Sequence, residues 1–317
     1  MILNNINHSF GYHTEKIVTM FFPLEKIRND EPSEIEVTTE LNQNSISVSV
    51  RLVAKVQRAQ RTVSEGEDVA QAMSLLLYQT LSAMTGFTPP WGILYGVRPA
   101  RLMHAKCDLL GEDGAKAYFR ECLVQEPKIE LAAEVMQREN AVIALSKPNS
   151  CSLYISIPFC PSRCSYCSFV SHSIENAAEL IEPYVDLLCK ELTENAKIVR
   201  DLGLQVETIY FGGGTPTTLS STQLDKILAV LECHYDLSTL REYTVEAGRP
   251  DTVTEAKLQT LLSHGVSRIS INPQTFNDAV RAAVGRRHTT EQTIQAYQLA
   301  KQCGFENINM DLIAGLT

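Results

Sequence analysis

Short apolar runs alternate with longer amphipathic segments through the second half of the chain. Within the longer segments, apolar residues recur every three or four positions, which is typical of helices that cover one face of a sheet. Strands that alternate with helices in this way predict parallel βα units and an α/β fold. The expected strands are residues 153–157, 208–211, 243–247, 268–271 and 308–312, and the expected helices are residues 177–201, 221–234, 255–264, 276–284 and 290–303.

The first half of the chain has a different pattern. Residues 16–22 and 33–56 contain alternating apolar and polar positions, which predict half-buried antiparallel strands. Helical periodicity is found over residues 67–84, 99–110, 115–123 and 127–145. A turn-rich step at residues 147–150 separates the two halves. We therefore expect an N-terminal α+β accessory domain of unknown role over residues 1–148 and an α/β domain over residues 149–317.

Composition and charge argue against a nucleic-acid-binding or membrane-spanning protein. The 317 residues include 44% hydrophobic and 21% charged positions, and the formal net charge is −9. This acidic balance argues against nucleic-acid binding, which usually needs a basic face. No run approaches about 18 consecutive apolar residues, so we expect no membrane span. Nine cysteines, an odd number, without a secretory leader indicate reduced thiols and a cytoplasmic location.

Three of the nine cysteines lie close together directly after the first expected strand of the α/β half. Cys160, Cys164 and Cys167 have the spacing C-x3-C-x2-C. Cysteine thiolates hold iron–sulfur clusters. A [4Fe–4S] cluster has four irons, so three cysteines leave one iron without a protein ligand. An open coordination position of this kind is typical of a catalytic metal site. Zinc with His172 as fourth ligand is an alternative, although the usual second C-x2-C pair is missing. Ordinary buried thiols are the other alternative, but the spacing favours the cluster.

Glycine or polar residues follow the other expected strands, at the edge where a βα barrel builds its active site. The run Gly212-Gly213-Gly214 would let a ligand approach the backbone closely, although glycine turns often follow strands for conformational reasons alone. Glu246 ends an apolar strand, where a carboxylate needs a ligand or an arginine as partner. Asn272, Gln274 and Asp311 are other polar residues after strands, with turns or caps as the alternative roles. Arg286 and Arg287 open a connection between two expected helices, and solvated charges are their alternative role.

In this order, the motifs resemble those of the radical S-adenosylmethionine (SAM) enzymes. The cysteine loop, GGGTPT, VEA, RISINPQTFND and NMDLIAGL are most similar to the oxygen-independent coproporphyrinogen III oxidase (dehydrogenase) family and its close paralogues. The resemblance covers about residues 150–317 and implies a partial (βα) barrel of the radical SAM type. It also predicts that the barrel is truncated after the fifth strand, since relatives continue beyond the point that corresponds to Thr317.

The resemblance implies two kinds of cofactor, a [4Fe–4S] cluster and SAM. The implied cluster ligands are Cys160, Cys164 and Cys167. The residues implied to contact the SAM that binds the open iron are Tyr154, Gly213 and Glu246. The residues implied for a second SAM site are Tyr166, Gly214, Thr215, Gln274, Arg286 and Asp311.

By the same resemblance, the reaction is the oxidative decarboxylation of coproporphyrinogen III propionates to vinyls, which gives protoporphyrinogen IX in porphyrin and haem biosynthesis. The implied partners are the tetrapyrrole and an electron donor such as a flavodoxin or ferredoxin. The oxidases carry a fourth cysteine two residues after the triplet, where this chain has Phe169. In this respect the chain is closer to oxidase-like paralogues, some of which bind and deliver haem. A haem-trafficking protein without oxidase activity is therefore the alternative.

Overall fold

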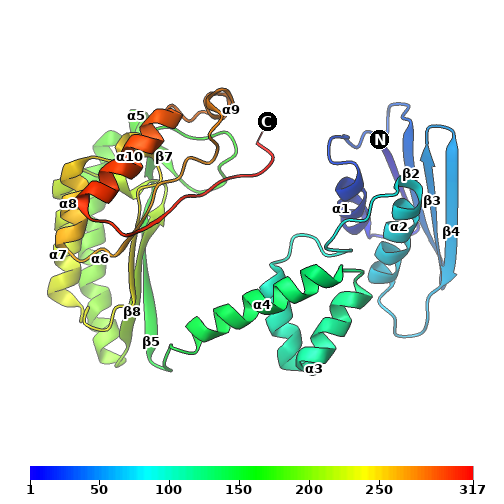
Figure 1. Ribbon diagram of the computed structural model, residues 1–317, viewed down its shortest axis with the longest axis horizontal. Helices are drawn as coiled ribbons and strands as arrows, with labels where there is room; N and C mark the ends of the chain where they lie inside the picture. The colour runs from blue at the N-terminus through cyan, green and yellow to red at the C-terminus, as the bar shows by residue number, and fades with distance from the viewer. Residues whose placement is uncertain (317) are drawn as a thin grey trace. The chain divides into compact units, whose positions relative to one another are not determined.

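The computed structural model describes residues 1–316, which form two compact units, residues 1–145 and 146–316. Each unit has its own hydrophobic core. Figure 1 shows a sheet and several helices in the first unit and a sheet covered by helices in the second. Within residues 1–316, none of the helices combines the length and the apolar character that a membrane crossing requires.

The first unit is built around a sheet in the order β1-β2-β3-β4, in which only the β1–β2 pair is parallel. Alternate residues of β3, including Ile46, Val48 and Val50, are fully or almost fully buried beneath the helices, which explains the alternating sequence pattern. The elements of this unit are β1 (Ile2–Ile6), α1 (Gly11–Phe21), β2 (Ile35–Asn42), β3 (Ser45–Leu52), β4 (Lys55–Thr62), α2 (Val69–Thr85), α3 (Pro99–Glu121), which is kinked at Gly111, and α4 (Glu126–Ile143).

One expectation for this unit is wrong, because residues 16–21 lie in helix α1 and form no strand. The buried side chains of this helix are Thr14, Ile17, Val18 and Phe21, whose spacing of three or four residues places them on one helical face. The polar residues among them suggested alternation, but the larger apolar side chains follow the helical period.

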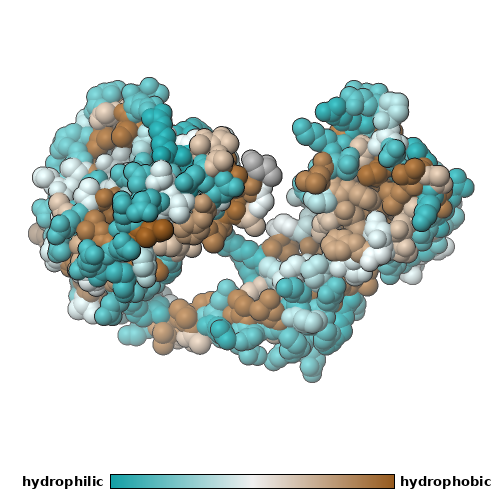
Figure 2. Space-filling model, turned by 45° about the horizontal axis from the view of Figure 1, so that its top comes forward, coloured by the Kyte–Doolittle hydropathy of each residue, from teal (hydrophilic) through white to brown (hydrophobic). Residues whose placement is uncertain are grey.

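Helix α4 keeps several apolar side chains on its surface. Figure 2 shows apolar patches on this part of the first unit, and Leu131, Val135, Val142 and Ile143 are all more than a third exposed. Single exposed apolar residues are common in proteins, so these side chains alone do not assign a binding partner.

In the described part of the second unit, the main sheet has five parallel strands in the order β11-β10-β9-β8-β5. The α/β fold with a parallel sheet is therefore confirmed. The elements are β5 (Ser150–Ile157), β6 (Phe159–Cys160), β7 (His172–Ser173), α5 (Ile174–Ala177), η1 (Ala178–Leu180), α6 (Ile181–Asp201), β8 (Gln205–Gly213), η2 (Pro216–Thr218), α7 (Ser221–His234), β9 (Glu242–Glu246), η3 (Pro250–Thr252), α8 (Glu255–Ser263), β10 (Arg268–Ser270), α9 (Asp278–Ala283), α10 (Thr290–Cys303) and β11 (Asn307–Asn309).

The two faces of this sheet differ in chemistry. Figure 1 shows α6, α7, α8 and α10 on one side of the sheet, and the alternate strand residues that pack against them are apolar, including Ile155, Phe211 and Val245. The strand residues on the opposite face, which we call the inner wall, are mostly polar: Ser152, Tyr154, Ser156, Thr208, Tyr210, Glu242, Thr244, Glu246, Arg268, Ser270 and Asn309. Short hydrogen bonds join neighbouring strands across this wall, such as Thr208 Oγ1 to Ser152 Oγ at 2.8 Å. The wall is therefore suited to a polar ligand.

A β-bulge lies where β5 and β8 pair. Cys151 is opposite Val206 and Ser152 is opposite Thr208, so Glu207 is an extra residue on β8. The Glu207 side chain is only 8% exposed and accepts hydrogen bonds from Ser146, Ser150 and Arg241. These bonds, with Ser150 and Arg241 contributing most, lower the pKa of Glu207 from 4.5 to about 2.

We expect this carboxylate to make the stability of the second unit depend on acid. Because its pKa is lower in the folded state, its stabilising contribution is complete above pH 4.5 and is lost as the pH falls towards about 2. In Glu207→Gln, the free energy of unfolding measured by urea titration should fall less steeply over this range than in the parent protein. The exposed Glu306→Gln variant is the control and should keep the parental slope. Equal slopes in Glu207→Gln and the parent would contradict the expectation.

Candidate functional site

The three clustered cysteines lie on a loop that is closed at its base, beyond the carboxyl end of β5. Cys160 is in β6, which pairs with β7, and Cys164 and Cys167 lie between these two short strands. The loop is held at its base by the hydrogen bond from His172 N to Pro158 O at 2.7 Å. All three thiols are free and partly exposed. The structure thus presents three accessible sulfur donors on one segment, and thiolates are the ligands that iron–sulfur clusters require.

A site for a single metal ion, such as zinc, is the alternative to a cluster. Nowhere in the described part of the chain do three His, Cys, Asp or Glu side chains gather in a way that could hold one ion. His172, the fourth zinc ligand considered from the sequence, is exposed in β7.

The glycine run at the end of β8 passes directly beside the cysteine loop. A Cβ on Gly214 would lie 2.7 Å from Phe159 O and 3.0 Å from both Ile157 O and Cys160 Sγ. Gly213 has a φ of 104°, which residues with a side chain rarely adopt. The N–H groups of Gly214 and Thr215 donate to Ile157 O and Phe159 O, each at 2.8 Å.

A further contact reaches the sulfur of Cys160. The hydroxyl of Thr215 faces the sulfur of Cys160, with 3.4 Å between Oγ1 and Sγ. The glycines therefore form a cradle, in which the backbone lies next to the sulfur of Cys160 and no side chain intervenes. Three cysteine thiols are a donor set that fits a [4Fe–4S] cluster.

The connection after α9 holds the far side of the cysteine loop. Ser162 Oγ donates to Gly285 O at 2.9 Å, and Ser165 N donates to Val284 O at 3.0 Å. Arg249, only 2% exposed, donates from Nη1 to Ser162 Oγ at 3.1 Å. The loop is therefore positioned by segments that follow β8, β9 and β10, which all end at the same edge of the sheet.

Tyr154 and Glu246 lie on the inner wall and are linked through Tyr210. The rings of Tyr154 and Tyr210 stack with centroids 5.8 Å apart and planes 11° apart, and the Tyr210 hydroxyl donates a hydrogen bond to Glu246 Oε1. Burial raises the pKa of Glu246, as does the nearby charge of Asp311, against the hydrogen bond from Tyr210. Tyr154 remains 64% exposed, so one face of this group is open to a ligand.

Gln274 and Asp311 meet beside the carboxyl ends of β10 and β11. Gln274 N donates to Asp311 O at 3.0 Å, and Gln274 has a φ of 64°. Asp311 N in turn donates a hydrogen bond to Asn272 Oδ1, with 3.1 Å between the two atoms. The expected fifth strand is shifted, because β11 covers Asn307–Asn309 and the chain then pairs only through an isolated bridge between Gln274 and Leu312.

Arg286 and Tyr166 contact each other near Cys164. Arg286 Nη1 lies 3.3 Å from Tyr166 Oη, and burial raises the pKa of Tyr166. Arg286 also donates to Asn272 O, so it is connected to Gln274 and Asp311 through Asn272. Besides the cysteines with the glycine run, the sequence-predicted residues thus form three local groups: Tyr154 with Glu246, Gln274 with Asp311, and Tyr166 with Arg286.

Sequence reasoning assigned no role to Tyr210 and did not identify how Arg249 holds the loop. The place of Tyr210 on the polar face could have been predicted from the sequence. It lies two residues after the polar Thr208, and alternate residues of one strand share a face. The partner of Arg249 in the loop, Ser162, is 87 positions away in sequence, so no local pattern reveals that contact.

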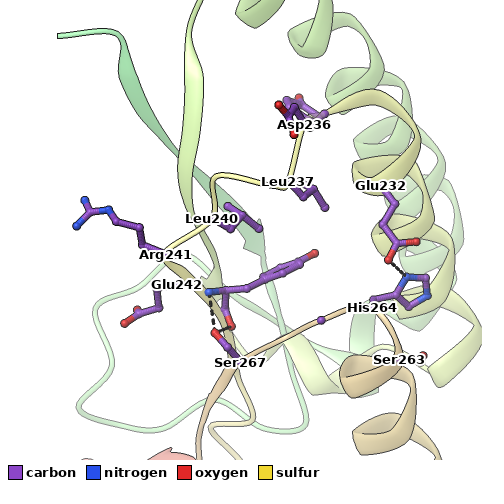
Figure 3. Close-up of a pocket in the computed structure, with 12 residues that line it drawn as sticks. Glu232, Asp236, Leu237, Leu240, Arg241, Glu242, Ser263, His264 and Ser267 are labelled. Carbon is purple, nitrogen blue, oxygen red and sulfur yellow. Dashed lines mark hydrogen bonds and ion pairs between the residues drawn. The ribbon is translucent and has the colours of Figure 1, made fainter. Parts of the chain in front are cut away.

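A pocket of about 550 Å³ lies at the opposite, amino ends of β9 and β10. Figure 3 shows His264 facing Glu232 in this pocket, with 2.9 Å between Nδ1 and Oε1. Burial alone would lower the pKa of His264, but its hydrogen bonds to Asp225 and Glu232 raise it overall. Among the residues that the structure shows lining the pocket, none is a sequence-predicted site residue. Active sites of βα folds lie at the carboxyl edge, so we place the candidate site at the cysteine loop.

Comparison with known proteins gives a consistent family. The radical SAM superfamily matches residues 154–317. The oxygen-independent coproporphyrinogen-III oxidase-like protein HemZ of Bacillus subtilis is 36% identical over 303 residues, which cover 90% of this chain and 60% of HemZ. The heme chaperone HemW of Lactococcus lactis is 38% identical over 172 residues, which cover 54% of this chain and 42% of HemW. The chain thus spans only about half of the length of these curated relatives.

Among solved structures, coproporphyrinogen III oxidase from Escherichia coli, described as a radical SAM enzyme, matches with 28% identity and a TM-score of 0.47. The match covers 57% of this chain and 41% of that chain.

The family match covers the cysteine loop, the glycine run and all the strand ends that form the candidate site. Radical SAM proteins use a [4Fe–4S] cluster and SAM, so the cofactors expected from the sequence are confirmed at the level of the family. The chain belongs to the radical SAM superfamily, and among its relatives are coproporphyrinogen oxidase-like proteins.

Proposed function

We propose that this chain is a radical SAM enzyme that acts on a tetrapyrrole, with Cys160, Cys164 and Cys167 as ligands of the [4Fe–4S] cluster. The observation that carries the proposal is the closed loop of three free thiols beside the glycine cradle, at the carboxyl edge of a parallel sheet. Three cysteines leave one iron of the cluster available to SAM. When bound, these cofactors together supply a carbon-centred radical that takes a hydrogen atom from substrate.

The residues around the loop have distinct parts in holding SAM. Tyr154 offers an exposed aromatic face at the inner wall, and Gly213 gives backbone access at the end of β8. Glu246, held in place by Tyr210, offers a carboxylate that can accept hydrogen bonds from an amine or hydroxyl group. These three residues would contact the SAM molecule that binds the open iron.

A second SAM site is the finer part of the proposal. Its residues would be Tyr166, Gly214, Thr215, Gln274, Arg286 and Asp311. Support comes from their grouping along the carboxyl edge, where Asn272 connects Arg286 to the Gln274–Asp311 pair.

For the reaction, we propose oxidative decarboxylation of the propionate groups of coproporphyrinogen III. A hydrogen atom leaves the β-carbon of the propionate, the carboxylate leaves as carbon dioxide, and one further electron passes to an acceptor, so that a vinyl group remains. The name of the relative HemZ, which matches 90% of this chain, supports this substrate class. An electron donor such as a flavodoxin or ferredoxin would reduce the cluster.

A haem chaperone is the second candidate, and Phe169 supports it. Phe169 stands where the oxidases carry a fourth cysteine, and it is 67% exposed, next to Val170, which is 83% exposed. Exposed apolar side chains beside the cysteine loop would suit contact with the flat face of a porphyrin. Relatives named heme chaperone match about half of the chain.

An anaerobic assay on the reconstituted chain distinguishes these functions. The protein is incubated with SAM, a reductant, an electron acceptor and coproporphyrinogen III, and 5′-deoxyadenosine, carbon dioxide and vinyl products are measured by mass spectrometry. We expect all three products, and a reaction without SAM serves as the control. Stoichiometric haem binding without vinyl product would support the chaperone instead. A protein that holds no cluster and yields no 5′-deoxyadenosine would overturn both the cluster assignment and the enzyme.

A further inference from the structure

Arg286 lies where three separate segments of the candidate site meet. Its Nη2 atom donates to Gly248 O at 2.8 Å and to Asn272 O at 2.7 Å, beyond the ends of β9 and β10. Its Nη1 atom faces the cysteine loop, 3.9 Å from Cys164 Sγ and 3.3 Å from Tyr166 Oη. The residue is only 6% exposed. One guanidinium therefore ties the loop to the carboxyl ends of two strands.

Arg286 differs from the buried arginines near it in the partners of its positive charge. Arg249 pairs with Asp251, and Arg281 pairs with Asp278. The partners that the structure describes for Arg286 are two carbonyls, a phenol and a thiol, with no carboxylate among them. A guanidinium stays protonated in proteins. A fixed positive charge without an acidic partner therefore lies beside a sulfur of the cysteine loop.

Such a charge would act on a cluster bound by these thiolates. The reduction potential of an iron–sulfur cluster depends on nearby charge and on hydrogen bonds to its sulfurs. Reduction adds one negative charge, which a neighbouring cation stabilises, and more strongly in a buried site than in water. The groups that hold metal ligands in place also change the affinity for the metal centre.

We propose that Arg286 is a positioning residue for the cluster, which tethers the cysteine loop to the ends of β9 and β10 and raises the reduction potential through its unpaired charge. This inference rests on the proposed function, because it needs Cys160, Cys164 and Cys167 to hold the cluster. It assigns Arg286 a contribution to cluster reduction that is separate from any contact with SAM.

The chain offers a matched control in the next residue. Arg287 carries the same charge, but its side chain is 70% exposed and pairs with Glu175 at 2.7 Å. The variants are therefore Arg286→Gln, Arg286→Lys and Arg287→Gln. Lysine retains the charge of Arg286, but a single ammonium group cannot reproduce the fork that reaches both strand ends and the loop.

The test is a potentiometric titration of the reconstituted cluster, followed by electron paramagnetic resonance without SAM or substrate. For Arg286→Gln we expect at least a tenfold fall in the equilibrium constant for one-electron reduction, which is about 59 mV to more negative potential. Arg286→Lys should restore most of the potential, and Arg287→Gln should match the parent. Amide hydrogen exchange of residues 158–171 in the cluster-free protein tests the tether separately, and it should accelerate in both Arg286 variants but not in Arg287→Gln.

The outcomes separate the inference from the function on which it rests. If Arg286→Gln fails to assemble a cluster, faster exchange of the loop in that variant supports the tether, and unchanged exchange refutes it. An Arg286→Gln variant with parental potential and parental loop exchange would overturn the inference while leaving the proposed function intact. A parent protein that assembles no cluster would overturn both.

Discussion

Replacement of Cys160 by serine should abolish both cluster binding and SAM cleavage. The parent protein, reconstituted without oxygen, should hold about four iron atoms per chain, whereas Cys160→Ser should lose most of this iron and the broad visible absorption of the cluster. The reason is that a serine hydroxyl remains protonated and is a much poorer iron ligand than a thiolate. Formation of 5′-deoxyadenosine should fall to background. Iron and sulfide analysis, the absorption spectrum and chromatography of the nucleoside product measure these effects.

The matched control is Cys233→Ser in helix α7. Cys233 is an exposed free cysteine outside the cysteine loop, so its replacement removes a thiol without touching the candidate site. We expect parental iron content and parental 5′-deoxyadenosine formation in this variant. Full cluster loading in Cys160→Ser, or equal losses in both variants, would contradict the assignment of the loop thiols as cluster ligands.

The second large effect is expected from Gly214→Ala, although it adds only one methyl group. The new Cβ would lie 2.7 Å from Phe159 O and 3.0 Å from Cys160 Sγ, so backbone on one side or the other must move. Overpacking of this kind usually costs about 1–3 kcal/mol of folding stability. Because the displaced backbone carries Cys160, we expect cluster loading to fall at least as clearly as stability. Urea unfolding of the apoprotein and iron analysis after reconstitution measure the two effects.

Gly248→Ala is the control for this variant, because it adds the same methyl group at the same edge of the sheet. There the nearest contact would be Asn272 Nδ2 at 3.6 Å, which is an ordinary packing distance. Stability and iron content should stay close to those of the parent. If Gly214→Ala behaves like Gly248→Ala, the close approach of β8 to the cysteine loop does not matter for the cluster.

The order of strands and helices in the second unit could be predicted from the sequence. The apolar runs are short and the intervening segments have a clear helical period, so βα alternation was apparent, and the predicted helix over residues 221–234 coincides with α7. The strand at residues 308–312 was misplaced, since Asn307 and Asn309 carry the pairing although they are polar. Backbone hydrogen bonds, which do not depend on side-chain character, decide pairing at such a strand.

The site was only partly predictable. Motifs identified the residues, most of which lie at or near the carboxyl ends of strands, but the contacts that organise them join distant parts of the chain. Arg286 and Cys164 are 122 positions apart, and Arg286 and Gly248 are 38 apart. The sequence analysis also missed the chemical difference between the two faces of the sheet, although the alternation of polar and apolar residues in β5, with polar Ser152, Tyr154 and Ser156, indicates it. Treating these strands as uniformly apolar hid the inner wall.

The extra residue in β8 has a consequence for how this strand can change in evolution. Residues on the same face of a regular strand are an even number of positions apart. Val206 and Ile209 are three positions apart, yet both pack in the core, because Glu207 is the extra residue of the bulge. Loss of Glu207 would leave an ordinary alternating strand, with Tyr210 still directed towards Glu246. An insertion between Thr208 and Gly213 would instead exchange the two sides of everything beyond it. Loss of Glu207 should therefore remove its hydrogen bonds but keep the two faces of β8 unchanged, whereas an insertion a few residues later should be eliminated by selection.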